Sequence, residues 1–271
     1  MNKQKRINQI CKDIKSVKIQ GARNIAKAAL YAYSLKPTKQ IKNKLLKLRP
    51  TEPMLLAVLN KLEKQPYKKI FKHFNESQQK INNNLLKIIK NKQVIFTHCH
   101  STNVIKALIY AKKKRKKFEV YNTETRPLFQ GRKTARELRK AGIKVTMFVD
   151  SALGVALSKE QGTKKADLVL LGADAILKKG IINKIGSETI AIISKQNKIP
   201  VYIVADSWKY TNKKVPIENR KLNEIWNRAP KNIKIKNPAF EFVPKKYIKA
   251  VVSEYGVLPY DKFLRKVRKK N

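Results

Sequence analysis

The chain has few cysteines and no long apolar segment. Its 271 residues include two cysteines, Cys11 and Cys99, which form no repeated disulfide framework and fit a reducing compartment. The basic start is not followed by the apolar region of a signal peptide. Lysines interrupt every stretch that could approach the length of a membrane-spanning helix. We therefore expect a cytoplasmic protein that does not insert into membranes.

Acidic residues are also scarce. The chain has 18 Asp and Glu against 63 Lys and Arg, a formal net charge of +45. Such a charge attracts polyanions, which include phosphorylated metabolites, nucleic acids and acidic membranes. The lysines are dispersed, and the one dense run, residues 112–117, falls where a helix is expected to end and where its dipole favours cations. Dispersal favours a solvated surface, so any binding of nucleic acid is expected to be unspecific and strongly salt-dependent.

Sequence motifs for nucleotides and metals are missing. No Gly-x-Gly-x-x-Gly follows the first expected strand and no Walker-type loop occurs, which argues against nicotinamide cofactors and nucleotide hydrolysis. His98 and His100 flank Cys99, but neighbours on an extended segment point to opposite faces. The other candidate ligands, Cys11 and His73, are distant in sequence. We predict neither a metal site nor a cofactor.

The first third of the chain has a helical pattern. Apolar residues recur at three- and four-residue steps over residues 7–17, 22–35, 54–62 and 81–89. Residues 50–53 interrupt the pattern, and Thr51 is a candidate N-cap for the helix that follows. We therefore predict a helical N-terminal domain over residues 1–90.

From Gln93 onward, short β-rich runs alternate with helical segments. The runs cover residues 94–96, 118–121, 144–149, 168–171 and 201–204. Alternation of this kind is typical of a parallel sheet covered by helices on both faces. We predict a Rossmann-like α/β domain over residues 91–271, with its site at the carboxyl ends of the strands. The basic tail from Lys262 to Asn271 is a candidate for fraying.

Two residues with acid–base chemistry follow strands of this predicted sheet. Cys99 lies at the turn between the first strand and a helix, where backbone N–H groups and the helix N-terminus can lower a thiol pKa. Asp174 follows the fourth strand, where an apolar environment can keep a carboxyl group protonated. Taken singly, Cys99 could equally be a small buried residue, and Asp174 a loop residue.

Four segments that occur in order along the chain carry a family resemblance. They are Thr-His-Cys-His-Ser at 97–101, Thr-Glu-Thr-Arg-Pro-x-x-Gln-Gly at 123–131, Gly-Ala-Asp at 172–174 and Ile-Asn-Lys-Ile-Gly at 182–186. The chain resembles the family that unites methylthioribose-1-phosphate isomerase, archaeal ribose-1,5-bisphosphate isomerase and the regulatory subunits of initiation factor 2B. The resemblance implies a helical domain packed on a Rossmann-like domain, and a homo-oligomer, either a dimer or a trimer of dimers.

The same resemblance implies which residues form the site. Cys99 and Asp174 match the catalytic positions of the family's enzymes. The matching positions for substrate binding are Gly21, Ala22, Arg23, Arg49, Ser101, Thr102, Asn103, Asn183, Lys184 and Lys209. Backbone N–H groups at helix starts and cationic side chains both suit a phosphate dianion.

Three features depart from the family pattern. Gln20 stands where the enzymes have Arg, His100 replaces an Asn, and the segment between Arg49 and Cys99 is short. The reaction implied is isomerisation of α-D-ribose 1,5-bisphosphate to ribulose 1,5-bisphosphate, with Cys99 as base and Asp174 as acid. Three alternatives stay open at this point: a methylthioribose-1-phosphate isomerase, a non-enzymatic subunit like those of initiation factor 2B, and an RNA-binding protein.

Overall fold

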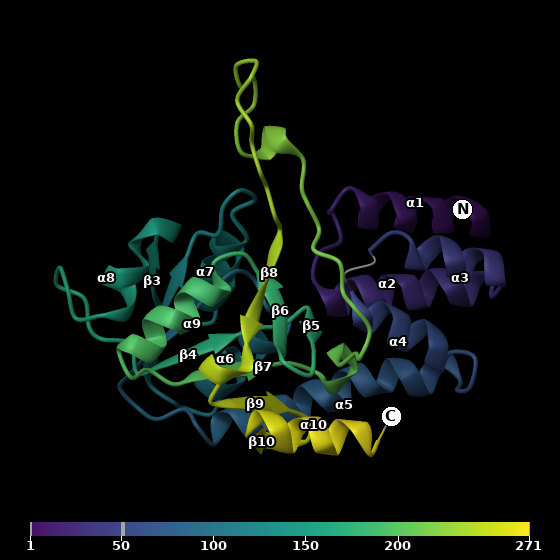
Figure 1. The fold of residues 1–271 in the computed structure, drawn as a ribbon. Coiled ribbons are helices and arrows are strands. Elements are labelled where there is room, and N and C mark those ends of the chain that lie inside the picture. The colour runs from purple at the N-terminus through teal and green to yellow at the C-terminus, as the bar shows by residue number, and fades with distance from the viewer. Residues whose placement is uncertain (1, 50–51, 271) are drawn as a thin grey trace.

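A computed structural model describes residues 2–49 and 52–270. Thr51, the candidate N-cap, lies outside the described residues. A group of helices forms one side of the molecule, and a sheet covered by helices forms the other (Figure 1). The predicted order, a helical part followed by an α/β part, is confirmed.

Five helices make up the N-terminal part of the chain. They are α1 (Lys3–Lys15), α2 (Ala22–Leu35), α3 (Lys39–Leu46), α4 (Pro53–Lys61) and α5 (Tyr67–Leu86). Helix α3 was not predicted, because it buries only Ile41 and Leu45 among lysines and polar residues. The last helix was placed too late, because the polar residues 75–80 separate the apolar positions of its first turns from Ile81.

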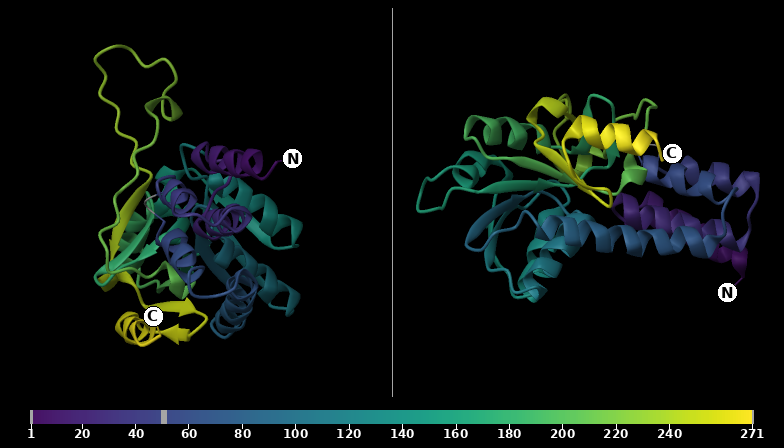
Figure 2. Two further views of the ribbon diagram at one scale, coloured as in Figure 1. Left: turned by 90° about the vertical axis from the view of Figure 1, so that its right-hand side faces the viewer. Right: turned by 90° about the horizontal axis from the view of Figure 1, so that it is seen from below.

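Helix α5 belongs to both parts of the molecule. Near its start, Ile70 and Phe74 pack with Leu30 and Met54 in a core of the helical part. Near its end, Ile81 and Leu85 pack in a core that includes strands of the sheet. Figure 2 shows the helix running from one part to the other. The predicted domain boundary near residue 90 therefore falls just beyond a helix that joins the two cores.

The main sheet has seven strands in the order β10-β9-β7-β4-β1-β2-β3. Its strands are β1 (Gln93–Thr97), β2 (Phe118–Thr123), β3 (Lys144–Phe148), β4 (Leu168–Leu171), β7 (Val201–Val204), β9 (Ala250–Ser253) and β10 (Gly256–Leu258). The first five are the predicted runs and are parallel, as expected. Strand β9 is also parallel, and the edge strand β10 is antiparallel. The sheet is therefore mixed at one edge.

Helices cover both faces of the main sheet. They are α6 (Thr102–Lys113), α7 (Gln130–Lys140), α8 (Leu153–Leu157), α9 (Ser187–Gln196) and α10 (Tyr260–Arg268). Helices α8, α9 and α10 contribute to one apolar core, whereas α5, α6 and α7 contribute to the other. The lysine run at 112–117 begins in the last turn of α6, as predicted. The basic tail does not fray up to Arg268, because Phe263, Leu264 and Val267 of α10 are buried.

A second, antiparallel sheet was not predicted. It consists of β5 (Ala175–Ile176), β6 (Gly180–Lys184) and β8 (Phe240–Pro244). Between β7 and β8, residues 211–239 form an arm that projects from the body and carries several exposed apolar side chains (Figures 1 and 2). Four short 3-10 helices complete the chain: η1 (Asp150–Ala152), η2 (Ser207–Lys209), η3 (Leu222–Glu224) and η4 (Lys245–Tyr247). Among the described residues, no helix is both long and apolar enough to cross a membrane.

The strand order fixes where a ligand site is expected. Strand β1 lies between β2 and β4, so the chain leaves β1 toward one side of the sheet and returns on the other. Side chains that follow β1 and β4 therefore meet at a topological switch point, where α/β sheets bind ligands. Thr97 and Leu170 are paired across these strands, so the two strands end at the same level. Cys99 follows one strand end and Asp174 follows the other.

Candidate active site

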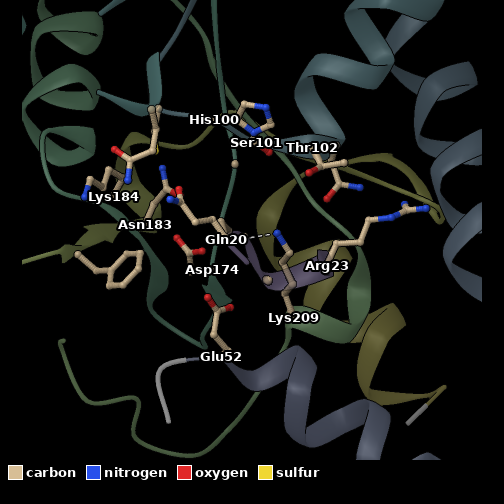
Figure 3. Close-up of a pocket in the computed structure, with 18 of the residues that line it drawn as sticks. Gln20, Arg23, Glu52, His100, Ser101, Thr102, Asp174, Asn183, Lys184 and Lys209 are labelled. Atoms are coloured by element: carbon tan, nitrogen blue, oxygen red, sulfur yellow. Dashed lines mark hydrogen bonds between the residues drawn. The ribbon is translucent and has the colours of Figure 1, made fainter. Parts of the chain in front are cut away.

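A single pocket between the helical part and the sheet contains all twelve residues expected at the site (Figure 3). They are Cys99, Asp174, Gly21, Ala22, Arg23, Arg49, Ser101, Thr102, Asn103, Asn183, Lys184 and Lys209. The residues come from the starts of α2 and α6, from the loops after α3, β1 and β4, from the end of β6, and from η2 after β7. The structure thus brings these residues together, while their roles stay predictions.

Cys99 is held in an uncommon backbone conformation beside this pocket. Its φ angle is 63°, in the left-handed region that few non-glycine residues adopt. Two hydrogen bonds fix it: its N–H donates to Thr125 Oγ1 at 3.0 Å, and its carbonyl accepts from Thr134 Oγ1 at 2.7 Å. Strain of this kind persists only where the surroundings impose it, and it is concentrated at functional sites.

The expected lowering of the Cys99 pKa is wrong. Burial raises the pKa of the thiol to about 11, and the nearby Lys184 acts in the opposite direction without reversing the shift. The carboxyl groups of Asp174 and Asp150 raise it further. Helix α6 begins only at Thr102, and a backbone hydrogen bond at His100 lowers the thiol pKa without reversing the shift.

Asp174 has the environment expected of a protonated acid. Burial raises its pKa, and this effect outweighs the opposing charges of Lys209, Arg49 and Lys184. The backbone N–H of Asp174 donates to the Ile182 carbonyl at 2.9 Å, which fixes the residue against β6. A carboxyl group with a raised pKa can act as a general acid near neutral pH.

Two glycines permit the close packing of the pocket wall. A Cβ atom on Gly172 would lie 2.7 Å from Ser101 Oγ, so only glycine lets the loops after β1 and β4 approach this closely. A Cβ atom on Gly131 would lie 1.7 Å from the Thr123 carbonyl oxygen. Both glycines lie in the family segments.

Cationic side chains lie on opposite sides of Asp174 (Figure 3). Lys184 lies on the side of Asn183, and Lys209 and Arg23 lie on the other. Lys184 and Lys209 are 6% and 5% exposed, and the Lys209 ammonium donates to the Ala173 carbonyl at 2.5 Å. Such buried cations are stabilised by an anionic ligand.

Arg23 and Arg49 differ in the partners that they already have. Arg23 donates to the neutral amide oxygens of Gln78 and Asn75 at 3.2 and 3.4 Å, and none of the ion pairs in the described part of the chain includes it. Arg49 Nη2 lies 3.0 Å from a Glu218 carboxylate oxygen and 3.7 Å from one of Glu52. A phosphate at Arg49 would therefore compete with carboxylates, whereas one at Arg23 would not.

Both histidines beside Cys99 have hydrogen-bond partners within the fold. His98 lies between the Thr123 hydroxyl at 2.5 Å and the Ile185 carbonyl at 2.8 Å, and burial lowers its pKa to about 4, so the ring is neutral. His100 Nε2 lies 3.1 Å from Glu137. These contacts engage both ring nitrogens of His98 and one of His100.

One other group of side chains in residues 2–49 and 52–270 lies close enough together to hold a metal ion: His73, Asp206 and Glu254. Both carboxylate oxygens of Asp206 already accept hydrogen bonds, from Ser77 and from the backbone N–H of Trp208. His73 Nε2 lies 3.2 Å from each oxygen, and its ring stacks on Trp208 at 3.5 Å. We interpret the group as a structural contact that holds α5 against the loop after β7.

The contact between His73 and Asp206 is expected to stabilise the fold. Replacing His73 by alanine removes a charged hydrogen bond to buried Asp206, so the free energy of unfolding should fall by about 1.5 to 3 kcal/mol in urea titrations. Lys72→Ala is the matched control, because that side chain is 74% exposed and its removal should be nearly silent. Equal effects of the two substitutions would contradict the assignment.

The sequence did not identify every residue that lines the pocket. Gln130, Lys133, Gln20 and Glu52 also line it. Gln130 belongs to a family segment, and its Oε1 is buried with no partner among the described residues, which is a signal of a missing ligand contact. Gln20 does occupy the pocket where the family has arginine. Glu52 gave no signal, because the break at residues 50–53, in which it lies, was interpreted only as the start of a helix.

The helical part, the seven-stranded sheet and the pocket between them define an α/β protein of the initiation factor 2B and methylthioribose-phosphate isomerase type. The chain belongs to the initiation factor 2 subunit family, whose model matches residues 5–260. The similarity therefore covers nearly the whole chain, including every residue of the expected site.

Individual relatives include both enzymes and a protein described as a translation factor. The chain is 34% identical to a ribose 1,5-bisphosphate isomerase of Methanocaldococcus jannaschii, over 93% of this chain and 91% of the relative. It is 31% identical to a 5-deoxyribose 1-phosphate isomerase of Clostridium botulinum, over 94% and 76%. A crystal structure described as Pyrococcus horikoshii translation initiation factor eIF-2B superposes with a TM-score of 0.81 at 25% identity, covering 94% of this chain and 97% of that one.

Proposed function

We propose that the protein is a sugar-phosphate isomerase that converts α-D-ribose 1,5-bisphosphate to D-ribulose 1,5-bisphosphate. The observation that carries the proposal is the meeting of Cys99 and Asp174 in one pocket, at the ends of adjacent strands, with lysines on both sides. A thiol, a carboxylic acid and phosphate-binding cations are the groups that an intramolecular aldose–ketose conversion needs. The similarity to ribose 1,5-bisphosphate isomerases supports this choice of substrate.

The proposed reaction opens the sugar ring and transfers protons, and it needs no redox cofactor or metal. Asp174 gives its proton to the ring oxygen while the bond between C1 and that oxygen breaks. Cys99, as thiolate, removes the C2 proton and leaves an enol. Asp174 then takes the proton of the C2 hydroxyl as C2 becomes a ketone, and Cys99 returns its proton to C1, which restores both groups.

Two separate cationic regions support a substrate with two phosphates. Lys184 adjoins Cys99 and lowers its pKa, so a phosphate there lies near the reacting carbons. Lys209 and Arg23 lie on the other side of Asp174 and suit the second phosphate.

Other functions rest on weaker observations. A methylthioribose-1-phosphate or 5-deoxyribose 1-phosphate isomerase would use the same proton transfers, and relatives with both names exist. A non-enzymatic subunit like those of initiation factor 2B is supported by overall fold similarity. Incubation with the three sugar phosphates and analysis of the products distinguishes these possibilities.

We also propose that the protein works in the cytoplasm as a homo-oligomer, either a dimer or a trimer of dimers. The arm at residues 211–239 carries exposed apolar side chains, namely Ile217, Leu222, Ile225, Trp226 and Ile233, that a second copy of the chain could cover. Specific binding of nucleic acid is not part of the proposal, because the lysines are spread over the whole chain.

The pKa shifts predict how turnover depends on pH. With the thiol pKa raised to about 11, the thiolate fraction grows about tenfold per pH unit through neutrality. Because the pKa of Asp174 is also raised, the acid stays protonated above its usual range. We therefore expect kcat/KM to rise through pH 7 and to level off where Asp174 loses its proton. A profile that falls through neutrality would contradict these assignments.

A further inference from the structure

Glu52 brings a second carboxyl group into the pocket beside that of Asp174. It is the N-cap residue of α4, a position where a carboxylate commonly accepts hydrogen bonds from the first N–H groups of the helix. The Glu52 side chain makes no such bond. It lines the pocket instead, and Figure 3 shows its carboxyl group turned toward Asp174.

The surroundings of Glu52 do not fully satisfy a negative charge. The residue is 3% exposed, and its Oε2 has no hydrogen-bond partner within residues 2–49 and 52–270. The nearest cation, Arg49, is 3.7 Å from Oε1, beyond hydrogen-bond distance, and it lies closer to Glu218. A buried carboxylate in this position is costly unless it holds a proton or finds a donor.

Charges from several elements act on the two carboxyl groups. Burial and the charge of Asp174 raise the pKa of Glu52 to about 8, and Glu218 adds to this, while Arg49 and Lys209 oppose it. Burial and, to a lesser extent, the charge of Glu218 raise the pKa of Asp174 as well, while Lys209, Arg49 and Lys184 oppose the shift. Two carboxyl groups facing one another in a buried site cannot both ionise easily, so they titrate as a pair.

We propose that Glu52 is a positioning residue that shares a proton with Asp174 and thereby keeps Asp174 protonated for the ring-opening step. This inference rests on the proposed function for its catalytic meaning, but the sharing of the proton does not depend on a substrate. Glu52 touches no reacting atom in this account. It acts through Asp174. Once one of the two carboxyl groups is ionised, its negative charge makes loss of the remaining proton unfavourable.

The test replaces Glu52 by glutamine, which keeps the size of the side chain and removes its charge. Asp174 then loses its proton at lower pH, so the rise of kcat/KM with pH should end about one to three pH units earlier. Above that point kcat/KM should be lower than in the unmodified protein by the same factor, about 10- to 1000-fold, with KM little changed. Glu52→Asp, which keeps a carboxyl group, should restore the pH at which the rise of kcat/KM ends in the unmodified protein.

Glu63→Gln is the matched control. Glu63 lies just beyond α4, its carboxylate is 52% exposed, and it pairs with Lys42 away from the pocket. The control makes the same change in charge at a site away from the pocket. Its pH profile of kcat/KM should therefore match that of the unmodified protein. The proposal is overturned if the rise of kcat/KM in Glu52→Gln ends at the same pH as in the unmodified protein, while thermal unfolding shows that the fold is intact.

A measurement without substrate separates this proposal from the proposed function. Infrared difference spectra against Asp174→Asn follow the protonated Asp174 carboxyl group as the pH is raised. This band should disappear at lower pH in Glu52→Gln than in the unmodified protein. If it does so while no sugar phosphate is turned over, the proton sharing holds and the isomerase assignment fails. If turnover occurs and the band titrates identically in both proteins, the proton sharing fails.

Discussion

Replacing Cys99 by serine, or Asp174 by asparagine, is expected to lower turnover of ribose 1,5-bisphosphate by about 10²- to 10⁴-fold, the usual cost of losing a general acid or base. Both side chains face the pocket and neither belongs to an apolar core, so the fold should be retained. Steady-state rates of ketose formation measure the loss, and circular dichroism checks the fold.

Each of these substitutions has a control elsewhere in the chain. Cys11→Ser removes the other thiol, which is buried in the core of the helical part, and it should leave kcat of the folded protein unchanged. Asp261→Asn removes an exposed carboxylate that pairs with Lys245 on the surface. Near-normal turnover in Cys99→Ser or Asp174→Asn would show that the roles are assigned wrongly.

Removing a cation on either side of Asp174 is expected to raise KM for the bisphosphate. Lys184→Ala and Lys209→Ala each delete a charged hydrogen bond worth about 1.5 to 3 kcal/mol, which corresponds to about 10- to 100-fold in KM. Lys184→Ala should also slow the reaction, because it removes the charge that lowers the Cys99 pKa. Michaelis constants for both variants measure these effects.

The same two variants discriminate between substrates. A monophosphate has one anionic end, so only one of the two substitutions should affect its binding. Lys249→Ala, which removes an exposed lysine distant from the pocket, should change neither constant. A silent substitution at Lys184 or Lys209, together with better turnover of a 1-phosphate, would contradict the bisphosphate assignment.

Much of the fold follows from local patterns in the sequence. Five strands of the main sheet and the bounds of α2 were predictable, because the strands are short runs rich in β-branched and aromatic residues or leucine and α2 has a regular apolar face. Helix α3 was not, since it buries only two residues in eight. The small second sheet was not predictable either, because β5 has two residues and pairs only through tertiary contacts.

The composition of the pocket was predictable from family segments, but its electrostatics were not. The positions of Cys99 and Asp174 follow from strand ends, whereas the raised thiol pKa depends on how deeply the pocket is closed. Glu52 is the clearest case. Its side chain could have capped α4, and only the packing of that helix start beside Asp174 turns it into the pocket.

The central claim is that this pocket isomerises a sugar phosphate through Cys99 and Asp174. The most direct measurement is NMR of the products after the purified protein is incubated with ribose 1,5-bisphosphate, 5-methylthioribose 1-phosphate or 5-deoxyribose 1-phosphate. The account predicts ketose from all or some of these, fastest from ribose 1,5-bisphosphate, and almost none with Cys99→Ser or Asp174→Asn. Absence of ketose from every sugar phosphate, or formation that persists unchanged in both variants, would contradict it.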